Sequence, residues 1–294
     1  MRLLSLKSRD NEVGALATGH GVIDLETLND LFATDWDVNI EALVQSGRVG
    51  ELNQWYREEF SKINLAHYSS GFRSSKLTYA PIERNPPMIL GIGLNYRDHA
   101  ADLGAVAPQN EPATFMKPRT TIIGPEDAIV IPGKSMRTTA EAELGVVVAR
   151  RCKDIPKESW LDYIAGFTAI LDMTAEDILE QNPRFLTRSK SFDTFLSLGG
   201  ELLTPDEFTD LSKVKVATLK HGKVYRENVV SNMTFSPGSL VSFLSSELTL
   251  EAGDIILTGT PGAVAISGDD FVEAQIDGFA PLRNAVISEL PSSR

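Results

Sequence analysis

Two glutamates, Glu141 and Glu143, stand near the start of a segment whose later residues predict a β-strand. The segment is TTAEAELGVVVAR, and apolar residues such as Leu144 and Val146 dominate its second half. Side chains two positions apart in a strand point to the same face, about 6.6 Å apart along the backbone. Two carboxylates held this close repel each other by roughly 2–3 kcal/mol at an effective dielectric constant of about 20. Because a bound cation removes that repulsion, the pair indicates a divalent-metal site.

A third carboxylate, Asp172, ends the apolar segment GFTAILD, which belongs to a second predicted strand at residues 164–174. Three carboxylates without a cysteine or histidine favour a hard cation, Mg²⁺ or Mn²⁺, with Ca²⁺ as a further option. The simpler alternative is that Asp172 only caps the helix predicted for AEDILEQ. The spacing alone leaves both interpretations open.

His99 and Glu111 form a candidate general base. His99 follows the glycine-rich strand end GIGLNY, and Glu111 comes twelve residues later. A carboxylate that orients an imidazole and stabilises its charged form makes a workable base for the activation of water. A single histidine is more often structural, so the pair taken alone is weak support for catalysis.

Lys190 and the turn GTPGAV are candidate contacts for an anionic substrate. Lys190 lies in RSKSFDTF and can bind a carboxylate of a ligand or form an ion pair within the protein. The turn ends an apolar strand and offers the backbone N–H of Gly259 and the hydroxyl of Thr260. No GKS or GKT follows, and GIGLN lacks the GxGxxG fingerprint, so neither segment predicts a nucleotide site.

The composition is that of an ordinary globular protein. The chain has 294 residues, 42% of them hydrophobic and 23% charged, and its formal net charge is −12. This charge argues against nucleic acids and anionic membranes as partners. The single cysteine, Cys152, excludes an intrachain disulfide. The first residues lack the apolar core of a signal peptide, and no apolar run approaches the roughly 20 residues of a membrane helix. We therefore expect a soluble, cytoplasmic protein.

A proline-rich segment, LTYAPIERNPP, divides the chain. Residues 1–80 predict a small N-terminal α/β domain, with a β-hairpin whose arms are LLSL and GVIDL, and with helices over residues 26–64. Residues 86–294 predict many short strands and few helices. The expected fold class is therefore α+β, with a mixed β-roll or barrel in the larger domain rather than a doubly wound sheet.

The sequence resembles the fumarylacetoacetate hydrolase superfamily over about residues 86–294. Six segments carry the resemblance, and they stand in the family's usual order: GLNYRDHA, NEPATFMKP, AEAELGVVV, GFTAILDMTAED, SKSFDTF and LTGTPGAV. Any one of them is weak, but all six in sequence are specific. The resemblance implies a β-roll catalytic domain like the C-terminal domain of fumarylacetoacetase, in an enzyme that is a homodimer.

The resemblance also implies roles for the residues named above. Glu141, Glu143 and Asp172 match the family's metal ligands, commonly for Mg²⁺ or Mn²⁺. His99 and Glu111 match the water-activating dyad of its acylpyruvate-cleaving members.

Lys190 matches an active-site lysine of the family. Thr260 stands where family members contact the substrate carboxylate or its neighbours. Tyr96 in GLNYRDHA and Gly259 beside Thr260 are further candidate substrate contacts.

The sequence departs from the family pattern just after Asp172. Family members often carry an arginine and a glutamine that reach the active site, at positions that are Glu176 and Leu179 here. Ala140 likewise replaces a frequent tyrosine or histidine. An anion in place of a cation is expected to change substrate recognition or the reaction.

The expected function is metal-dependent hydrolysis of a C–C bond in a small anionic 2-oxo acid, such as an acylpyruvate or another 2,4-dioxo acid. The metal would chelate the carboxylate and 2-oxo oxygen as a Lewis acid and stabilise the enolate that forms. Decarboxylation of an oxaloacetate-type acid and enol–keto isomerisation use the same enolate and remain alternatives. A catalytically silent ligand-binding protein is the alternative from another class.

Overall fold

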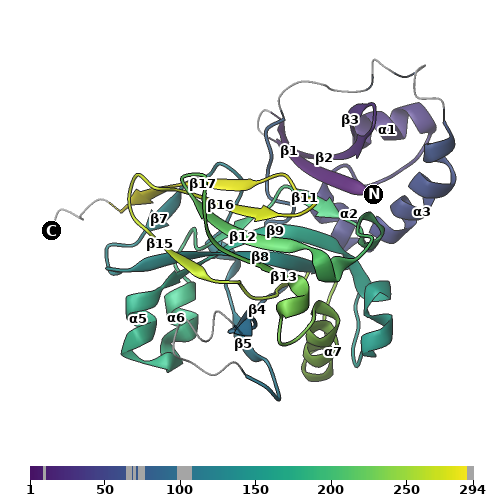
Figure 1. Cartoon of the computed structure of the whole chain (residues 1–294). Helices are drawn as coiled ribbons and strands as arrows, with labels where there is room; N and C mark the ends of the chain where they lie inside the picture. Colours follow the sequence, from purple (N-terminus) through teal and green to yellow (C-terminus); the bar gives the residue numbers. More distant parts are fainter. Residues whose placement is uncertain (9–10, 64–67, 69–70, 72–76, 98–107, 290–294) are drawn as a thin grey trace.

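Two mixed β-sheets form the centre of the molecule, with helices around them (Figure 1). The computed structural model describes residues 1–8, 11–63, 68, 71, 77–97 and 108–289. In this part of the chain the sheets make an open roll rather than a closed barrel. The α+β class predicted from the sequence is confirmed.

The larger sheet contains the strands that carry the three carboxylates. Its strands follow one another in the order β3 (Gly21–Asp24), β2 (Asn11–Thr18), β1 (Arg2–Ser8), β11 (Glu201–Leu203), β9 (Ile164–Ala175), β8 (Thr138–Val148), β14 (Ile255–Leu257), β4 (Ile89–Gly93) and β5 (Ala113–Met116). Three short strands join this path from the side: β6 (Ile122–Ile123), β10 (Leu196–Leu198) and β15 (Ala263–Ile266). The pairings β14–β4 and β10–β6 are parallel, which makes the sheet mixed.

The smaller sheet packs on one face of β8. Its order is β13 (Lys223–Val229), β12 (Lys215–Lys220), β16 (Phe271–Ile276), β17 (Leu282–Ser288) and β7 (Ile129–Ile131). The even-numbered residues of β8 from Ala140 to Val148 share one hydrophobic cluster with Val216 and Ala274 of this sheet. The odd-numbered side chains point the other way because strand side chains alternate. Glu141 and Glu143 are therefore on the face that turns away from the smaller sheet.

The described helices are short and surround the sheets (Figure 1). They are α1 (Leu25–Phe32), α2 (Ile40–Gln45), α3 (Val49–Glu58), α5 (Glu176–Gln181), α6 (Leu186–Lys190) and α7 (Pro237–Glu247). Short 3-10 helices lie in the connections between strands and helices, at Phe60–Lys62, Arg119–Thr121, Lys157–Tyr163, Pro183–Phe185, Pro205–Glu207, Leu211–Lys213 and Val230–Asn232. The helix α5 follows β9 directly, so it starts four residues beyond Asp172, the last of the three candidate carboxylate ligands, at Glu176.

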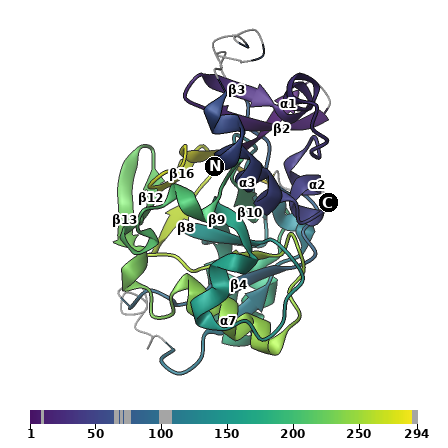
Figure 2. The same ribbon diagram turned by 90° about the vertical axis from the view of Figure 1, so that its right-hand side faces the viewer.

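The N-terminal strands and helices α1–α3 lie together at one end of the molecule in both views (Figures 1 and 2). The expected hairpin is wrong in its pairing. LLSL and GVID are both strands, but β2 lies between them and pairs with each. On its other edge β1 pairs with β11, so the three N-terminal strands β1, β2 and β3 extend the larger sheet. The division into domains at residues 1–80 and 86–294 stays a prediction.

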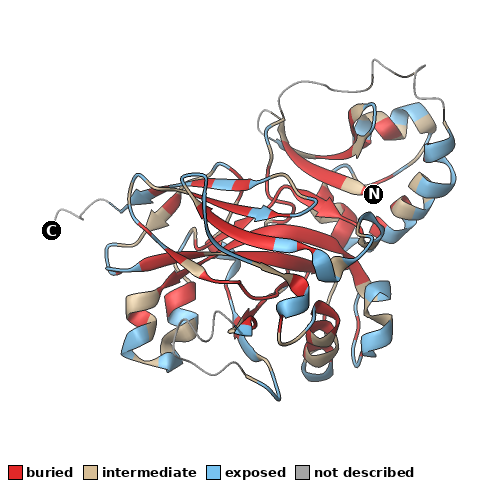
Figure 3. Cartoon of the chain, in the orientation of Figure 1, coloured by how far each residue is buried: buried red, intermediate tan, exposed pale blue. Residues whose placement is uncertain are grey.

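The buried residues concentrate along β8 and β9, which run through the middle of the molecule (Figure 3). Every residue of β9 is buried, and in β8 only Glu141 is partly exposed. Within the described residues, no helix is long and apolar enough to cross a membrane.

Candidate metal centre

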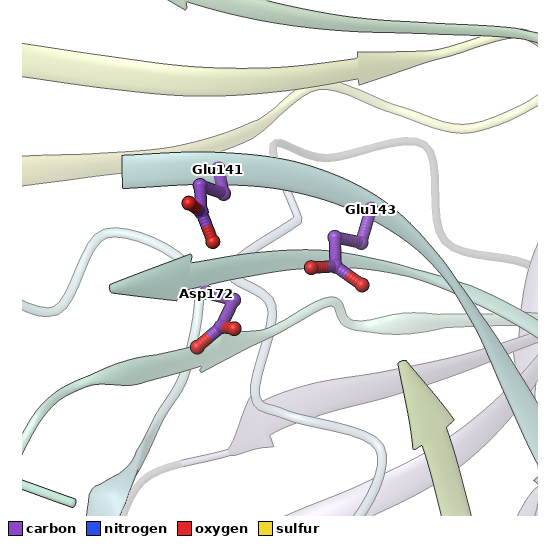
Figure 4. Close-up of side chains that lie close together, drawn as sticks. All are labelled: Glu141, Glu143 and Asp172. Atoms are coloured by element: carbon purple, nitrogen blue, oxygen red, sulfur yellow. The ribbon is translucent and has the colours of Figure 1, made fainter. Parts of the chain in front are cut away.

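Strands β8 and β9 bring the three predicted carboxylates together. The antiparallel register places Glu141 directly opposite Asp172, and Glu143 lies two residues further along on the same face. One carboxylate oxygen from each residue lies within 4.8 Å of the others. Figure 4 shows the three side chains gathered in one space between the strands. The strand periodicity and the cross-strand register therefore create the cluster.

This arrangement fits a divalent cation. Two oxygen ligands on opposite sides of Mg²⁺ or Mn²⁺ are at most about 4.2 Å apart, and around Ca²⁺ about 4.8 Å, given metal–oxygen distances of about 2.1 and 2.4 Å. Small side-chain rotations would bring oxygens that lie within 4.8 Å of one another to those distances. The donors are all carboxylates, the ligands that hard cations prefer. The described residues thus include a group able to hold a divalent metal ion.

Two buried lysines already pair with this cluster. The Lys190 Nζ donates hydrogen bonds to Glu141 Oε2 at 2.8 Å and to Asp172 Oδ2 at 2.6 Å. The Lys117 Nζ donates to the other oxygen of Asp172, at 2.5 Å. Burial alone would raise the pKa of Asp172, but the two ammonium groups lower it below its ordinary value. Asp172 is therefore held as a carboxylate.

The pKa values of the two lysines shift in opposite directions. Burial lowers the pKa of Lys117 to about 8, although Asp172 counteracts this effect. Burial would also lower the pKa of Lys190, but Asp172, Glu141 and Glu143 together raise it above its ordinary value. Lys190 therefore remains charged at neutral pH.

Glu143 is the ligand candidate that lacks a lysine partner among the described residues. Its Oε2 accepts a hydrogen bond from the backbone N–H of Gly259 at 2.6 Å. Burial, with a further contribution from Asp172, raises the pKa of Glu143 well above its ordinary value. Three carboxylates and two ammonium groups leave one net negative charge when all are ionised. A divalent cation would turn this into one net positive charge and keep Glu143 ionised.

The cluster opens into a cavity of about 470 Å³, which is within the usual range for small-molecule sites. Glu141, Glu143 and Lys190 line this cavity. Helix α5 contributes Glu176 and Leu179 to the lining. A ligand in this cavity would therefore contact both the carboxylate cluster and the first turns after β9.

Comparisons with known proteins show the family of the chain. The family described as fumarylacetoacetate (FAA) hydrolase C-terminal matches residues 88–287, which is more than half of the chain. The chain belongs to the fumarylacetoacetate hydrolase superfamily. This superfamily contains hydrolases and isomerases, and its members are enzymes.

Relatives match about two thirds of this chain, and several solved structures match nearly all of it. An uncharacterized protein of Archaeoglobus fulgidus is 43% identical over 203 residues, which are 69% of this chain and 79% of that protein. The structure of 5-carboxymethyl-2-hydroxymuconate delta-isomerase from Mycobacterium smegmatis has a TM-score of 0.72 and 27% identity, and the match covers 99% of this chain and 100% of the isomerase.

Maleylpyruvate hydrolase from Sphingobium sp. SYK-6, solved with manganese(II) and pyruvate, has a TM-score of 0.76 and 22% identity, over 99% of this chain and 100% of that chain. At this identity the likeness shows the shared fold.

The structure brings some of the residues predicted from the superfamily resemblance to the cavity and leaves others elsewhere. Thr260 lines the cavity, and Gly259 reaches it through its hydrogen bond to Glu143. Tyr96 is fully buried in the hydrophobic core and lies outside the described cavity lining. Burial raises the pKa of Tyr96, and the charge of Glu143 adds to this shift.

The predicted dyad is only partly described. Glu111 is exposed and lies outside the described lining of the cavity. His99 lies outside the described residues. The roles of His99, Glu111 and Tyr96 in this superfamily member therefore stay predictions.

Lys117 is a site residue that the sequence reasoning missed. It follows β5 in NEPATFMKP, one of the segments that carry the family resemblance, and its side chain is fully buried against Asp172. A lysine directly after a short strand has no periodic signal that distinguishes it from a surface residue. Its place in a family segment was the only indication that the sequence offered.

Proposed function

We propose that the protein is a divalent-metal-dependent hydrolase that cleaves a C–C bond in a 2,4-dioxo acid and releases pyruvate or a related 2-oxo acid. The observation that carries the proposal is the cluster of Glu141, Glu143 and Asp172, which is paired with two buried lysines and reaches a cavity through Glu141, Glu143 and Lys190. With a divalent cation this group has a net positive charge, which suits an anionic substrate in a protein whose overall charge is −12.

The metal, held by Glu141, Glu143 and Asp172, would act as a Lewis acid toward the carboxylate and 2-oxo oxygens of the substrate. Lys190 and Lys117 fix the orientation of the Asp172 carboxylate through both of its oxygens. The Gly259 N–H holds one oxygen of Glu143, which leaves its other oxygen free for a ligand. Thr260 lies beside this group, and its hydroxyl, which donates to the Gly262 carbonyl oxygen at 3.2 Å, would turn away from that oxygen to donate to the substrate.

In the proposed reaction, His99 oriented by Glu111 takes a proton from water, and the water oxygen forms a bond to the carbonyl carbon at position 4. The bond between carbons 3 and 4 then breaks, and its electron pair forms the enolate of the 2-oxo acid. Protonation at carbon 3 completes one product, and the acyl part leaves as a carboxylic acid. The positive charge of Lys190 stabilises the developing enolate.

The manganese(II) and pyruvate in the maleylpyruvate hydrolase structure support Mn²⁺ or Mg²⁺ as the metal and a pyruvate-like product. The superfamily resemblance supports a homodimer, which light scattering coupled to size-exclusion chromatography would test.

Enol–keto isomerisation is the second candidate function. The likeness to the delta-isomerase of Mycobacterium smegmatis over nearly the whole chain favours it. Isomerisation needs a proton shuttle but no attack by water, so its product contains no oxygen atom from the solvent.

The decisive experiment is turnover of acetylpyruvate in ¹⁸O-labelled water. We expect pyruvate release that EDTA abolishes and Mn²⁺ restores, with one labelled oxygen atom in the acetate product. The His99→Ala variant should lose this activity by at least about a hundredfold, as expected for the loss of a general base.

Turnover that persists in EDTA would contradict the proposal. So would wild-type conversion of a dienol acid to its keto form without any acylpyruvate cleavage, which would favour the isomerase. The control for nonspecific effects is Glu158→Gln, which changes an exposed residue of the 3-10 helix Lys157–Tyr163. This variant should keep full activity.

A further inference from the structure

Apart from the carboxylate cluster and Lys190, the wall of the cavity is mainly apolar. It consists of side chains from the end of β4, from β5, and from the two short helices after β9. Six of these residues are Ile92, Leu94, Phe115, Leu179, Pro183 and Leu186. The far part of a ligand would therefore lie against hydrocarbon surface, which favours an apolar group over a solvated one.

The charged residues on this wall are acidic. Glu176, at the start of α5, lines the cavity, and its side chain is only 14% exposed. Burial raises the pKa of Glu176, while Arg137 opposes the shift. Glu180, one turn later, lines the cavity as well. A second carboxylate on a ligand would approach these two acids and would meet like-charge repulsion.

Two cations close to the cavity, Arg137 and Lys190, are already paired with carboxylates. Arg137 lies 2.8 Å from Glu176 and 3.6 Å from Glu180, its side chain is 56% exposed, and it lies outside the described lining. Lys190 is the cation among the described lining residues, and it donates to Glu141 and Asp172. The described wall thus offers no available positive charge for a distal carboxylate.

We propose that this site selects 2-oxo acids whose far end is uncharged and apolar and discriminates against dicarboxylic acids of the same length. Glu176 and Leu179 are the specificity-determining residues. The inference rests on the proposed function, because the first carboxylate and the 2-oxo group must bind at the carboxylate cluster. A positively charged far end fits less well, because Glu176 is already paired with Arg137 and the rest of the wall is mainly apolar.

Two unreactive ligands of equal length test this directly. 2-Oxohexanoate and 2-oxohexanedioate both lack the 4-oxo group, so the proposed cleavage cannot occur, and they differ only at the far end. Calorimetric titration of the Mn²⁺-loaded protein should give a dissociation constant for 2-oxohexanoate that is lower by at least about tenfold.

Two variants locate the source of the discrimination. Leu179→Arg places a cation on the apolar wall and should reduce the preference by at least about tenfold, mainly through tighter binding of the dicarboxylate. Glu176→Gln keeps the shape and removes the negative charge, so it should reduce the preference by about threefold or more. The control Glu247→Gln makes the same change of net charge at an exposed position at the end of α7, outside the cavity, and should leave the preference unchanged.

Equal or tighter binding of 2-oxohexanedioate by the wild-type protein would overturn this inference and leave the proposed function standing. An unchanged preference in both wall variants would overturn the assignment to Glu176 and Leu179. If neither acid binds the Mn²⁺-loaded protein, the proposed function fails and the inference fails with it. The urea midpoint of each variant shows whether it is folded, and Glu176→Gln provides the test if Leu179→Arg does not fold.

Discussion

Asp172 is the residue on which the electrostatics of the site depend. It is fully buried, and each of its oxygens accepts a hydrogen bond from a lysine. A buried ion pair adds little stability compared with an apolar pair, but the removal of one partner leaves an uncompensated charge. The two lysines therefore compensate the buried negative charge of the carboxylate cluster in the folded chain before any cation binds.

The Lys117→Met variant should lower the free energy of unfolding by about 3 kcal/mol in EDTA, because it leaves one oxygen of Asp172 buried without its ion pair. Urea unfolding measures this change. Added Mn²⁺ should restore part of the loss, since a cation at the site compensates the same charge.

The control is Lys134→Met at an exposed position, for which we expect a change within about 0.5 kcal/mol. A loss of less than about 1 kcal/mol for Lys117→Met would show that the pairing with Asp172 does not carry the stability that we assign to it.

The turn after β14 is the element that positions Glu143. Gly259 has a φ of 95°, a conformation that residues with a Cβ rarely adopt. A Cβ at this position would lie 2.7 Å from the Cβ of Asn95. The Gly259 N–H holds Glu143, so the turn geometry and the orientation of a metal ligand candidate are coupled.

The Gly259→Ala variant should lose about 1–3 kcal/mol of unfolding free energy and bind Mn²⁺ about tenfold more weakly. Gly222→Ala is a matched control, because Gly222 has a φ of 73° but open space around a new Cβ. It should lose about 1 kcal/mol through backbone strain alone and keep its Mn²⁺ affinity. Equal Mn²⁺ affinity in both variants would show that the geometry of the turn at Gly259 does not affect metal binding.

The elements also show how far the sequence could predict this structure. The spacing of Glu141 and Glu143 indicated a shared strand face, and the apolar run before Asp172 indicated a strand end, because both depend on local periodicity. The register that places Glu141 opposite Asp172 depends on the pairing of β8 with β9, which no local pattern specifies. The pairing of β1 with β2 and β11 was missed for the same reason. Lys117 could not be assigned because only tertiary packing places it against Asp172.

At the scale of the whole molecule, the N-terminal residues share a hydrophobic cluster with the larger sheet. Leu3 and Leu16 belong to the same cluster as Ile170 and Leu257. Glu83 lies near this junction: it is 1% exposed and accepts a hydrogen bond from Gln45 of α2. Burial raises the pKa of Glu83 to about 8, and the nearby charges of Glu41 and Asp254 act in the same direction.

This shift predicts a pH dependence of stability. The pKa of Glu83 is about 8 in the folded chain against an ordinary value of 4.5, so the folded state binds more protons between these pH values. The contribution of Glu83 to stability therefore falls as the pH rises from about 4.5 to about 8. In Glu83→Gln this contribution disappears, and the variant should be more stable than the wild type at pH 9 by on the order of 3 kcal/mol.

Urea unfolding between pH 4 and pH 9 measures the difference, which should be small at the acidic end. The exposed Glu247→Gln variant should follow the wild-type curve. If the unfolding free energies of Glu83→Gln and the wild type depended on pH in the same way, this pH dependence could not be assigned to Glu83.

The central claim is that Glu141, Glu143 and Asp172 hold one divalent cation, and calorimetric titration with Mn²⁺ tests it most directly. The account predicts one ion per chain for the wild-type protein, a loss of at least about a hundredfold in affinity for Glu143→Gln, and unchanged binding for Glu247→Gln. A wild-type protein that does not bind Mn²⁺, or a Glu143→Gln variant that binds it with the same affinity, would contradict the account.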